Sequence, residues 1–334
     1  MSRRVTIDDV AEKAGVSYQT VSRVINNRPD VSPATRRRVQ TVILEMGYRP
    51  SRVARSLATA RTATIGLMVP DIANPFFSDV ARGVEQSAYD KGYSVLLCNT
   101  NEDLHREVEV LQMLDDKQVD GVIVCGLRQE SDSLCDALAR FPAAVLVNRR
   151  LESKPLPAIL IDDVRGGYLA TRHLLRSGHR VIGYVAGPPT SYSGRRRAEG
   201  FRQAYAEIGL LPQTDWTCHC LPIVEDGTVA VQQLIHQQPD ITGLFCYNDL
   251  VAVGALRACA ALGLRVPDDM AIVGYDDIQL AALMTPALTT CHIPRNEIGR
   301  LALDLLLRQI NGSQENNTVI DIEPQLVIRE SAPA

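Results

Sequence analysis

Several features that would define other classes of protein are absent from this chain. It has no uninterrupted run of about 18 apolar residues, and its amino terminus is polar and basic, so we expect no membrane span, no secretory signal and a cytoplasmic location. G-x-S-x-G, P-loop and strand-linked G-x-G-x-x-G patterns are missing, which gives no support to hydrolases, phosphate-transfer enzymes or dinucleotide-binding enzymes. The pairs Asp162-Asp163 and Asp276-Asp277 are adjacent carboxylates, for which turn or ligand roles are favoured over acid–base catalysis. We therefore expect no catalytic residues.

The cysteines are not arranged as a disulfide framework or as a set of metal ligands. Eight are present, mostly set singly in apolar stretches, which is typical of reduced core residues. The one close group is Cys218-His219-Cys220, and no second cysteine pair follows at zinc-ligand spacing. Alternation along a strand would point His219 away from both thiols, so a strand is favoured over a metal site. We expect neither a metal nor another cofactor.

Charge is distributed unevenly along the 334 residues. Residues 1–62 contain 12 Lys and Arg against 5 Asp and Glu, whereas the remainder contains 23 against 34. An acidic protein with a basic amino-terminal segment is expected if only that segment meets a polyanion such as DNA. A helical bundle with a solvated basic face would carry the same charge, so the residue pattern of the segment has to decide between them.

Residues 5–26 have the pattern of two short helices joined by a tight turn. Thr6 can cap a first helix whose apolar positions fall on one face, and Gly15 can end it. Ser17 can cap a second helix, which has apolar residues on its inner face and a polar stripe outside, and Ser32 can cap a third. Arginine can bond to the edge of guanine at two points, and glutamine to that of adenine, so such a stripe suits the reading of DNA bases. The stripe consists of Tyr18, Gln19, Ser22 and Arg23.

This segment resembles the DNA-binding domain of the lactose-repressor/galactose-repressor family. The likeness covers residues 5–26 and much of 31–58. It implies a helix-turn-helix head over residues 1–50 and, over residues 51–62, a hinge helix that enters the minor groove, where Leu57 wedges between base steps. An ordinary linker is the alternative for this last stretch, because Ala, Ser, Thr and Arg also suit one. The resemblance implies DNA contacts from Thr6, Ser17, Tyr18, Gln19, Thr20, Ser22, Arg23, Asn26, Thr35, Tyr48, Arg52, Ala54 and Leu57.

From residue 64 onward, short apolar runs alternate with amphipathic stretches. This alternation predicts an α/β body in which parallel sheets are covered by helices on both faces. Such sheets present ligand-binding residues in the loops that follow the carboxyl ends of their strands. We expect strands at 65–69, 94–98, 121–125, 144–147, 158–161, 181–186, 243–246 and 271–274, and helices that include 78–91, 104–117, 166–177 and 198–208.

Polar and aromatic residues collect after five of these strands, at residues 70–77, 148–150, 187–197, 247–249 and 275–277. Aromatic faces beside Arg, Asn and Asp suit a small polar ring, because the ring face stacks while hydroxyl groups take up fixed hydrogen bonds. The recurrence at equivalent strand ends favours a shared cleft. The alternative is that some members only shape turns or cap helices, as Asn74-Pro75, Asn248 and Asp276 would.

The body also resembles the sugar-binding core of the same family, which is similar to periplasmic sugar-binding proteins. The resemblance implies a two-lobed body at 63–334, with one lobe at 63–160 plus 293–320 and the other at 162–291 plus 322–334. Asn148 departs from the pattern, because many members carry an aspartate there, so a hydroxyl contact is neutralised or altered. The implied effector-binding residues are Asp71, Phe76, Phe77, Asn148, Tyr192, Arg197, Asn248 and Asp276.

Two functions remain open. The first is a sequence-specific DNA-binding regulator, most simply a repressor, that binds a palindromic operator and is controlled by a small polar effector of the sugar, sugar-acid or nucleoside class. We expect a homodimer and not a tetramer, because the chain stops soon after Glu330 without a leucine-heptad tail. The second is a free sugar-binding or carbohydrate-processing protein whose head serves another purpose. The basic head favours the first function.

Overall fold

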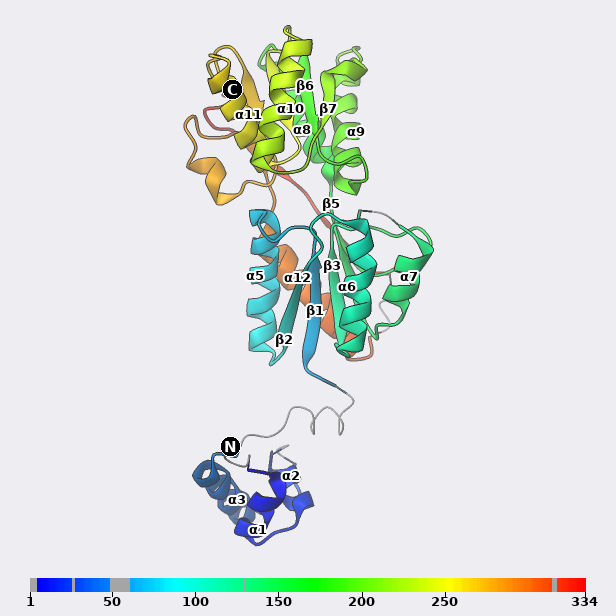
Figure 1. The fold of residues 1–334 in the computed structure, drawn as a ribbon, viewed down its shortest axis with the longest axis vertical. Coiled ribbons are helices and arrows are strands. Elements are labelled where there is room, and N and C mark those ends of the chain that lie inside the picture. Colours follow the sequence, from blue (N-terminus) through cyan, green and yellow to red (C-terminus); the bar gives the residue numbers. More distant parts are fainter. Residues whose placement is uncertain (1–4, 26–27, 49–60, 129, 314–316) are drawn as a thin grey trace. The chain divides into compact units, whose positions relative to one another are not determined.

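The computed structural model describes residues 5–25, 28–48, 61–128, 130–313 and 317–334 (Figure 1). By its internal contacts the chain divides into two compact units, Met1–Thr62 and Ala63–Ala334. Within the described residues, no helix is long and apolar enough to cross a membrane.

The first unit is a three-helix head. Its helices are α1 (Ile7–Ala14), α2 (Tyr18–Ile25) and α3 (Pro33–Met46), as the sequence predicts. Thr6 caps α1 through a reciprocal pair of hydrogen bonds with Asp9, and Gly15 ends the helix at φ 62°, which only glycine adopts without strain. The three helices share a small core of Val10, Ala11, Ala14, Val21, Val24, Val39 and Val42.

The first lobe of the second unit is built on a six-stranded parallel sheet. Its strand order is β11-β5-β4-β3-β1-β2. Helices α5 and α12 cover one face and α6 and α7 the other, so the strands are apolar on both sides. The strands are β1 (Thr64–Val69), β2 (Ser94–Asn99), β3 (Gly121–Cys125), β4 (Ala144–Val147), β5 (Ala158–Ile161) and β11 (Val319–Ile322); the helices are α5 (Pro75–Asp90), α6 (Leu104–Asp116), α7 (Asp132–Ala139) and α12 (Arg295–Ile310).

The second lobe has a four-stranded parallel sheet in the order β7-β6-β8-β9. Helices α8 and α9 pack on one face, and α10 and α11 on the other. The strands are β6 (Ile182–Ala186), β7 (Thr217–His219), β8 (Gly243–Cys246) and β9 (Ala271–Val273); the helices are α8 (Asp163–Arg176), α9 (Tyr192–Glu207), α10 (Val224–Gln237) and α11 (Asp249–Ala261), with the 3₁₀ turns η1 (Thr214–Trp216) and η2 (Gln279–Ala282).

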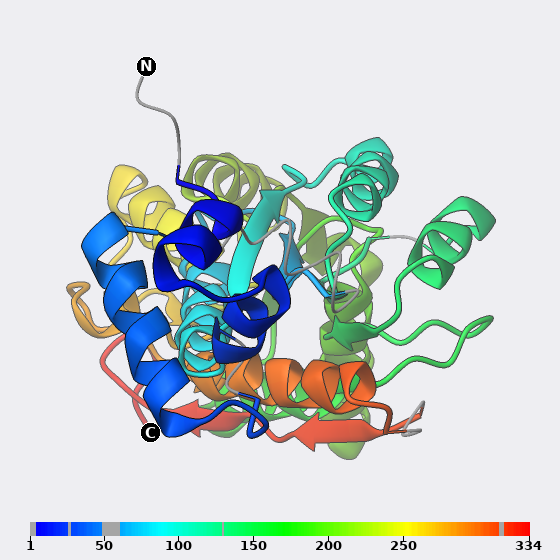
Figure 2. The same ribbon diagram turned by 90° about the horizontal axis from the view of Figure 1, so that it is seen from below.

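The carboxyl-terminal part of the chain, orange to red in Figure 2, contributes elements to both lobes. It gives α12 and β11 to the first lobe, whereas β10 (Thr290–His292) and β12 (Gln325–Val327) form an antiparallel pair beside the second. The lobes are therefore joined by several chain crossings, and the carboxyl ends of both parallel sheets face the space between them (Figure 1).

Three helices begin earlier than the sequence pattern predicts. Helix α8 starts at Asp163 instead of 166, because Asp162 caps it by accepting from the Arg165 amide at 3.0 Å. Helix α5 starts at Pro75 instead of 78, and α9 starts at Tyr192 instead of 198. Both starts are fixed by capping side chains, since Asn74 accepts from the Phe76 amide at 3.0 Å and Ser191 from the Gly194 amide at 3.1 Å. The apolar spacing on which the prediction relied begins only after the first helical turn.

Candidate effector pocket and DNA-reading surface

The outer face of α2 carries the predicted base-reading residues. Ser17, Tyr18, Gln19 and Arg23 are exposed, and the tyrosine side chain is 50% accessible. Arg23 reaches the Asp30 carboxylate at 3.3 Å, but both side chains are more than half exposed, so the pair is weak and the guanidinium is available. The inner face of the helix is held by Val21 and Val24.

The other predicted DNA contacts differ in how the structure places them. Ser17 and Thr20 lie at the start of α2, with their hydroxyl oxygens 3.0 Å apart. Thr35 is partly buried in the first turn of α3, and its hydroxyl is 2.9 Å from that of the capping Ser32. Thr6 is the cap of α1, Ser22 is half-buried on α2, and Tyr48 packs against the head's core. Asn26, Arg52, Ala54 and Leu57 lie outside the described residues.

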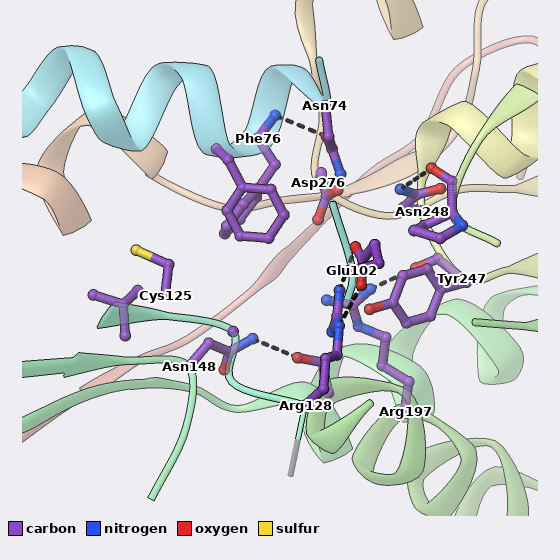
Figure 3. Close-up of a pocket in the computed structure, with 15 residues that line it drawn as sticks. Asn74, Phe76, Glu102, Cys125, Arg128, Asn148, Arg197, Tyr247, Asn248 and Asp276 are labelled. Atoms are coloured by element: carbon purple, nitrogen blue, oxygen red, sulfur yellow. Dashed lines mark hydrogen bonds and ion pairs between the residues drawn. The ribbon is translucent and has the colours of Figure 1, made fainter. Parts of the chain in front are cut away.

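A pocket lies between the two lobes at the carboxyl ends of their strands (Figure 3). Six of the eight predicted effector residues line it: Phe76, Phe77, Asn148, Arg197, Asn248 and Asp276. The other two do not. Asp71 accepts a hydrogen bond from the Ala73 amide and so shapes the loop before α5, whereas the Tyr192 ring lies beneath the guanidinium of Arg149.

The apolar wall of the pocket comes from the first turn of α5. Phe76 and Phe77 meet edge to face, with ring centroids 5.1 Å apart and planes at 83°. Their position depends on the Asn74 cap, which starts the helix at the rim of the pocket (Figure 3). Asn74 therefore does cap a helix, as the structural alternative proposed, and it also lines the pocket.

Arg197 is the most enclosed cation of the pocket. Its Nε donates to Asp163 at 2.8 Å, and its guanidinium lies 3.6 Å from the centroid of the Tyr275 ring. Burial alone would lower the pKa of Arg197, but Asp163 together with Tyr275, Asp276 and Tyr247 outweighs burial, and the pKa is raised well above the ordinary value. The side chain stays charged and immobile, so it presents a fixed edge to a ligand.

Arg128 and Glu102 form a second charged pair that the sequence analysis does not single out. An Nη of Arg128 donates to Glu102 at 2.6 Å, and Nε contacts the other carboxylate oxygen, so the pair is bidentate. A further bond of 3.4 Å from Arg128 reaches Ser191 of the second lobe. Glu102 follows strand β2 and Arg128 follows β3. The same strand-end rule applied to every strand would have found them.

Two carboxylates sit at the second-lobe side of the pocket. Asp249 is fully buried and accepts from the Thr290 hydroxyl at 2.6 Å and the Ile278 amide at 2.8 Å. Burial and the nearby Asp276 raise the pKa of Asp249 well above its ordinary value. Burial likewise raises the pKa of Asp276 to about 7, although Arg197 and Arg295 pull it down. Asp276 lines the pocket, so its carboxyl group faces the ligand space.

Asn148 connects the lobes. Its amide nitrogen donates to Asp163 at 3.1 Å and to the Ser193 hydroxyl at 2.8 Å, while its oxygen accepts from the Ile161 amide at 3.3 Å. All polar atoms of the side chain are therefore engaged. Asn248, in turn, caps α11 through the Val251 amide and presents its side chain at the pocket rim.

In this conformation the side chains nearly fill the pocket. The free volume is about 30 Å³, which is room for roughly one water molecule. Among the described residues, no group of three or more His, Cys, Asp and Glu side chains is placed to hold a metal ion. Cys218 packs toward α10 and Cys220 toward the second-lobe core, whereas His219 donates from Nδ1 to the Gly187 carbonyl at 2.8 Å.

Comparison with known proteins assigns each of the two units to a protein family. Residues 6–51 match the family described as bacterial regulatory proteins, lacI family, and residues 62–330 match that of periplasmic binding proteins and the sugar-binding domain of the LacI family. The chain is 40% identical over 328 residues to the HTH-type transcriptional repressor PurR of Pasteurella multocida (strain Pm70), and the alignment covers 98% of both proteins.

Solved structures agree over nearly the whole chain. The lac repressor dimer bound to operator and the anti-inducer ONPF is similar with a TM-score of 0.90 and 29% identity, covering 99% of this chain and 100% of that one. The complex of the transcriptional regulator CelR with cellobiose has a TM-score of 0.75 and 33% identity, covering 98% and 100%.

A helix-turn-helix head joined to a two-lobed α/β body defines a class of ligand-responsive transcriptional regulators. The chain belongs to the LacI family and is a DNA-binding repressor with an effector-binding body. The family resemblance and the fold predicted from the sequence are confirmed.

Proposed function

We propose that the protein binds a palindromic DNA operator as a homodimer. Two copies would present two α2 helices to two half-sites, which is how a twofold protein matches a twofold site. The exposed stripe of Tyr18, Gln19 and Arg23 on α2 would read base edges, and Leu57 would wedge between base steps at the centre. The similar lac repressor, which was solved as a dimer bound to operator, supports this arrangement.

We further propose that the pocket between the lobes binds a small polar effector of the sugar, sugar-acid or nucleoside class. The observation that carries this proposal is the combination of the Phe76 and Phe77 wall with fixed polar groups on Asn148, Arg197 and Asp276. A ring face can pack on the aromatic wall while hydroxyl groups bond to the polar side. The cellobiose bound to CelR supports a sugar as one candidate.

The filled pocket indicates how an effector would change the protein. A sugar needs far more than the free volume of about 30 Å³, so an entering ligand would have to displace bridging contacts between the lobes. Those contacts run from Arg128 to Ser191 and from Asn148 to Ser193. Breaking or replacing them would change the relative orientation of the lobes. If the effector changes the affinity for DNA in this way, DNA must change the affinity for the effector by the same factor.

A combined experiment tests the two parts of the proposal. Thermal-shift screening of pentoses, hexoses, sugar acids and nucleosides would identify the effector, since a ligand at about 100 times its dissociation constant stabilises by about 2.7 kcal/mol. Gel shifts with a palindromic operator, with and without that compound, would then test the coupling. Sequence-blind DNA binding would overturn the operator proposal and favour a free sugar-binding protein. An effector that stabilises wild type and Asp276→Asn equally would overturn the assignment of the pocket.

A further inference from the structure

A second hollow lies on the second lobe and shares no lining residue with the effector pocket. It opens at the edge of the four-stranded sheet, where β7 is the last strand, and is bounded by α9 and by the segment that includes η1. Figure 1 shows β7 and α9 together on this side of the lobe. The hollow has a volume of about 340 Å³. Sites for small molecules typically have about 300 to 1,000 Å³, so this one is large enough for a metabolite.

The base of the hollow is apolar and rigid. The rings of Tyr184 and Phe201 line it and stack with centroids 5.5 Å apart, and the Tyr184 hydroxyl is tied to the Gly194 carbonyl at 3.1 Å. Gly194 and Ala198 are one helical turn apart on the face of α9 that borders the hollow. Because neither has a large side chain, the hollow stays open along this face of the helix, while the rings of Tyr184 and Phe201 beneath it are almost fully buried.

The Cys218-His219-Cys220 group finds its structural explanation here. Thr217 and His219, two residues apart on β7, both line the hollow, while Cys218 packs in the opposite direction. Since a carbonyl oxygen can only accept, the 2.8 Å bond to Gly187 requires a proton on Nδ1 of His219. The other ring nitrogen, Nε2, is then free of that bond and is the ring's remaining polar atom.

The rim of the hollow is cationic. Arg195 and Arg202 line it, and Nη1 of Arg195 donates to the Pro189 and Thr190 carbonyls at 3.2 and 3.1 Å, which orients that guanidinium. Neither arginine takes part in any of the ion pairs among the residues that the structure describes, and none of the lining residues is acidic. The rest of this body carries more acidic than basic residues. Two unneutralised guanidinium groups beside an apolar hollow favour an anionic ligand with an apolar part.

We propose that this hollow is a second ligand site, which binds a small organic phosphate or carboxylate carrying a flat ring. The ring would lie against α9 at Gly194 and Ala198, above the buried Tyr184 and Phe201, and the anionic group would bind at Arg195 and Arg202. Helix α9 presents these residues on one side and gives Ser193 and Arg197 to the effector pocket on another. A compound bound in the hollow therefore contacts a helix that also shapes the effector pocket.

Ligand-observed NMR titration of the full-length protein tests this site with phenyl phosphate and benzoate as probes and phenol as their neutral counterpart. We expect one or both anions to bind, and phenol to bind much more weakly. The double variant Arg195→Gln, Arg202→Gln should weaken binding by about tenfold or more, since charge-assisted hydrogen bonds are lost. Ala198→Phe should abolish binding by filling the space. Which anion binds more tightly distinguishes a phosphate site from a carboxylate site.

Two controls localise the effect. Arg176→Gln removes an exposed arginine on α8 of the same lobe that does not line the hollow, and should leave the affinity for the probe unchanged. Asp276→Asn removes a negative charge from the effector pocket, so it would strengthen anion binding there but not in the hollow. The proposal is overturned if neither anion binds, if phenol binds as tightly as the anions, or if the double variant and Arg176→Gln behave alike.

Discussion

At position 148 an asparagine side chain donates a hydrogen bond to Asp163, which an ionised aspartate could not do. Asn148 donates to Asp163 at 3.1 Å, and both side chains are buried. An aspartate there would bring two buried carboxylates within hydrogen-bond distance of each other, where their negative charges would repel. The asparagine that departs from the family pattern is thus required by its neighbour. The Asn148 side chain also bonds to Ser193 of the other lobe, and an entering ligand would have to displace this bond.

The variant Asn148→Asp should therefore be destabilised at neutral pH by about 2 to 4 kcal/mol, as expected for an uncompensated buried charge. Because protonation of one of the two carboxylates relieves the repulsion, the loss should shrink as the pH is lowered. Urea unfolding followed by the fluorescence of the single tryptophan, Trp216, would measure it. Asn101→Asp is a matched control, since Asn101 at φ 54° resembles Asn148 at φ 53° but is not buried. Equal losses in the two variants would contradict the explanation.

Asp276 gives a second pH-dependent prediction. Its pKa is about 7 in the folded protein, against an ordinary value of 3.8, so the folded state holds its proton over a range in which the unfolded state has lost it. The contribution of Asp276 to stability is therefore full at acidic pH and falls as the pH rises from about 4 to 7, by up to about 4 kcal/mol. The free energy of unfolding of wild type minus that of Asp276→Asn should follow this curve. A difference that is constant with pH would show that Asp276 ionises normally.

Arg23 is the residue on which base selectivity should depend most. Replacing it with alanine should cost about 1 to 3 kcal/mol of operator binding and relax the preference at one base position. The exposed ion pair between Arg23 and Asp30 is weak and does not prevent the Arg23 side chain from contacting DNA. Gel shifts against a set of operators changed one base pair at a time would measure this, with Lys13→Ala on α1 as control. If all operators were weakened equally, Arg23 would contact only phosphate.

Helix α9 shows how an element positions a site. Gly200 on α9 packs against α8 so closely that an added Cβ would lie 2.0 Å from the Val164 carbonyl oxygen, and Gly167 on α8 makes the reciprocal contact with the backbone of Arg197. The two helices are among the most closely associated in the molecule, and Arg197 sits on this seam. The orientation of the Arg197 side chain therefore depends on two glycines that never reach the pocket.

Gly200→Ala should destabilise the body, although alanine in a helix is ordinarily better than glycine by about 1 kcal/mol. Overpacking against a backbone oxygen should cost about 1 to 3 kcal/mol or more, and the shift of α9 should weaken effector binding as well. Gly194→Ala on the same helix is the milder comparison, since an added Cβ there would lie 3.3 Å from side-chain atoms of Ser191 and Tyr247 instead of 2.0 Å from a backbone oxygen. Thermal unfolding of both variants would decide. Equal stability of Gly200→Ala and wild type would show that α8 and α9 separate easily.

Sequence reasoning located most strands closely, because most are short apolar runs, and those at the centre of the sheet, such as β1 and β3, are buried on both faces. It missed the first turns of α5 and α9, because capping by Asn74 and Ser191 is a local polar interaction without apolar periodicity. In the pocket it singled out Arg197 and Asp276 but not the pair Arg128 and Glu102. Each follows a strand end and could have been singled out, but their pairing depends on β2 and β3 lying on either side of β1, and this order is not readable from spacing alone.

At the scale of the whole molecule, the two units differ in the sign of their charge. The head carries 12 basic residues against 5 acidic ones, and the remainder carries 23 against 34. DNA binding through the head releases counterions, whereas an acidic body repels the same polyanion. The division of charge therefore favours DNA contact through the basic head and disfavours it through the acidic body.

Operator binding should consequently be steeply salt-dependent. With about 6 to 10 phosphate contacts in a dimer, the affinity should fall by roughly 10³ to 10⁵ between about 50 and 200 mM salt. Fluorescence anisotropy with a labelled operator across this range would give the slope of log affinity against log salt. Arg23→Ala should lower the affinity at every salt concentration but leave the slope nearly unchanged, because a base contact releases few counterions. A flat salt response would mean that the basic head does not neutralise DNA phosphates. Its charged side chains would then form only a solvated face.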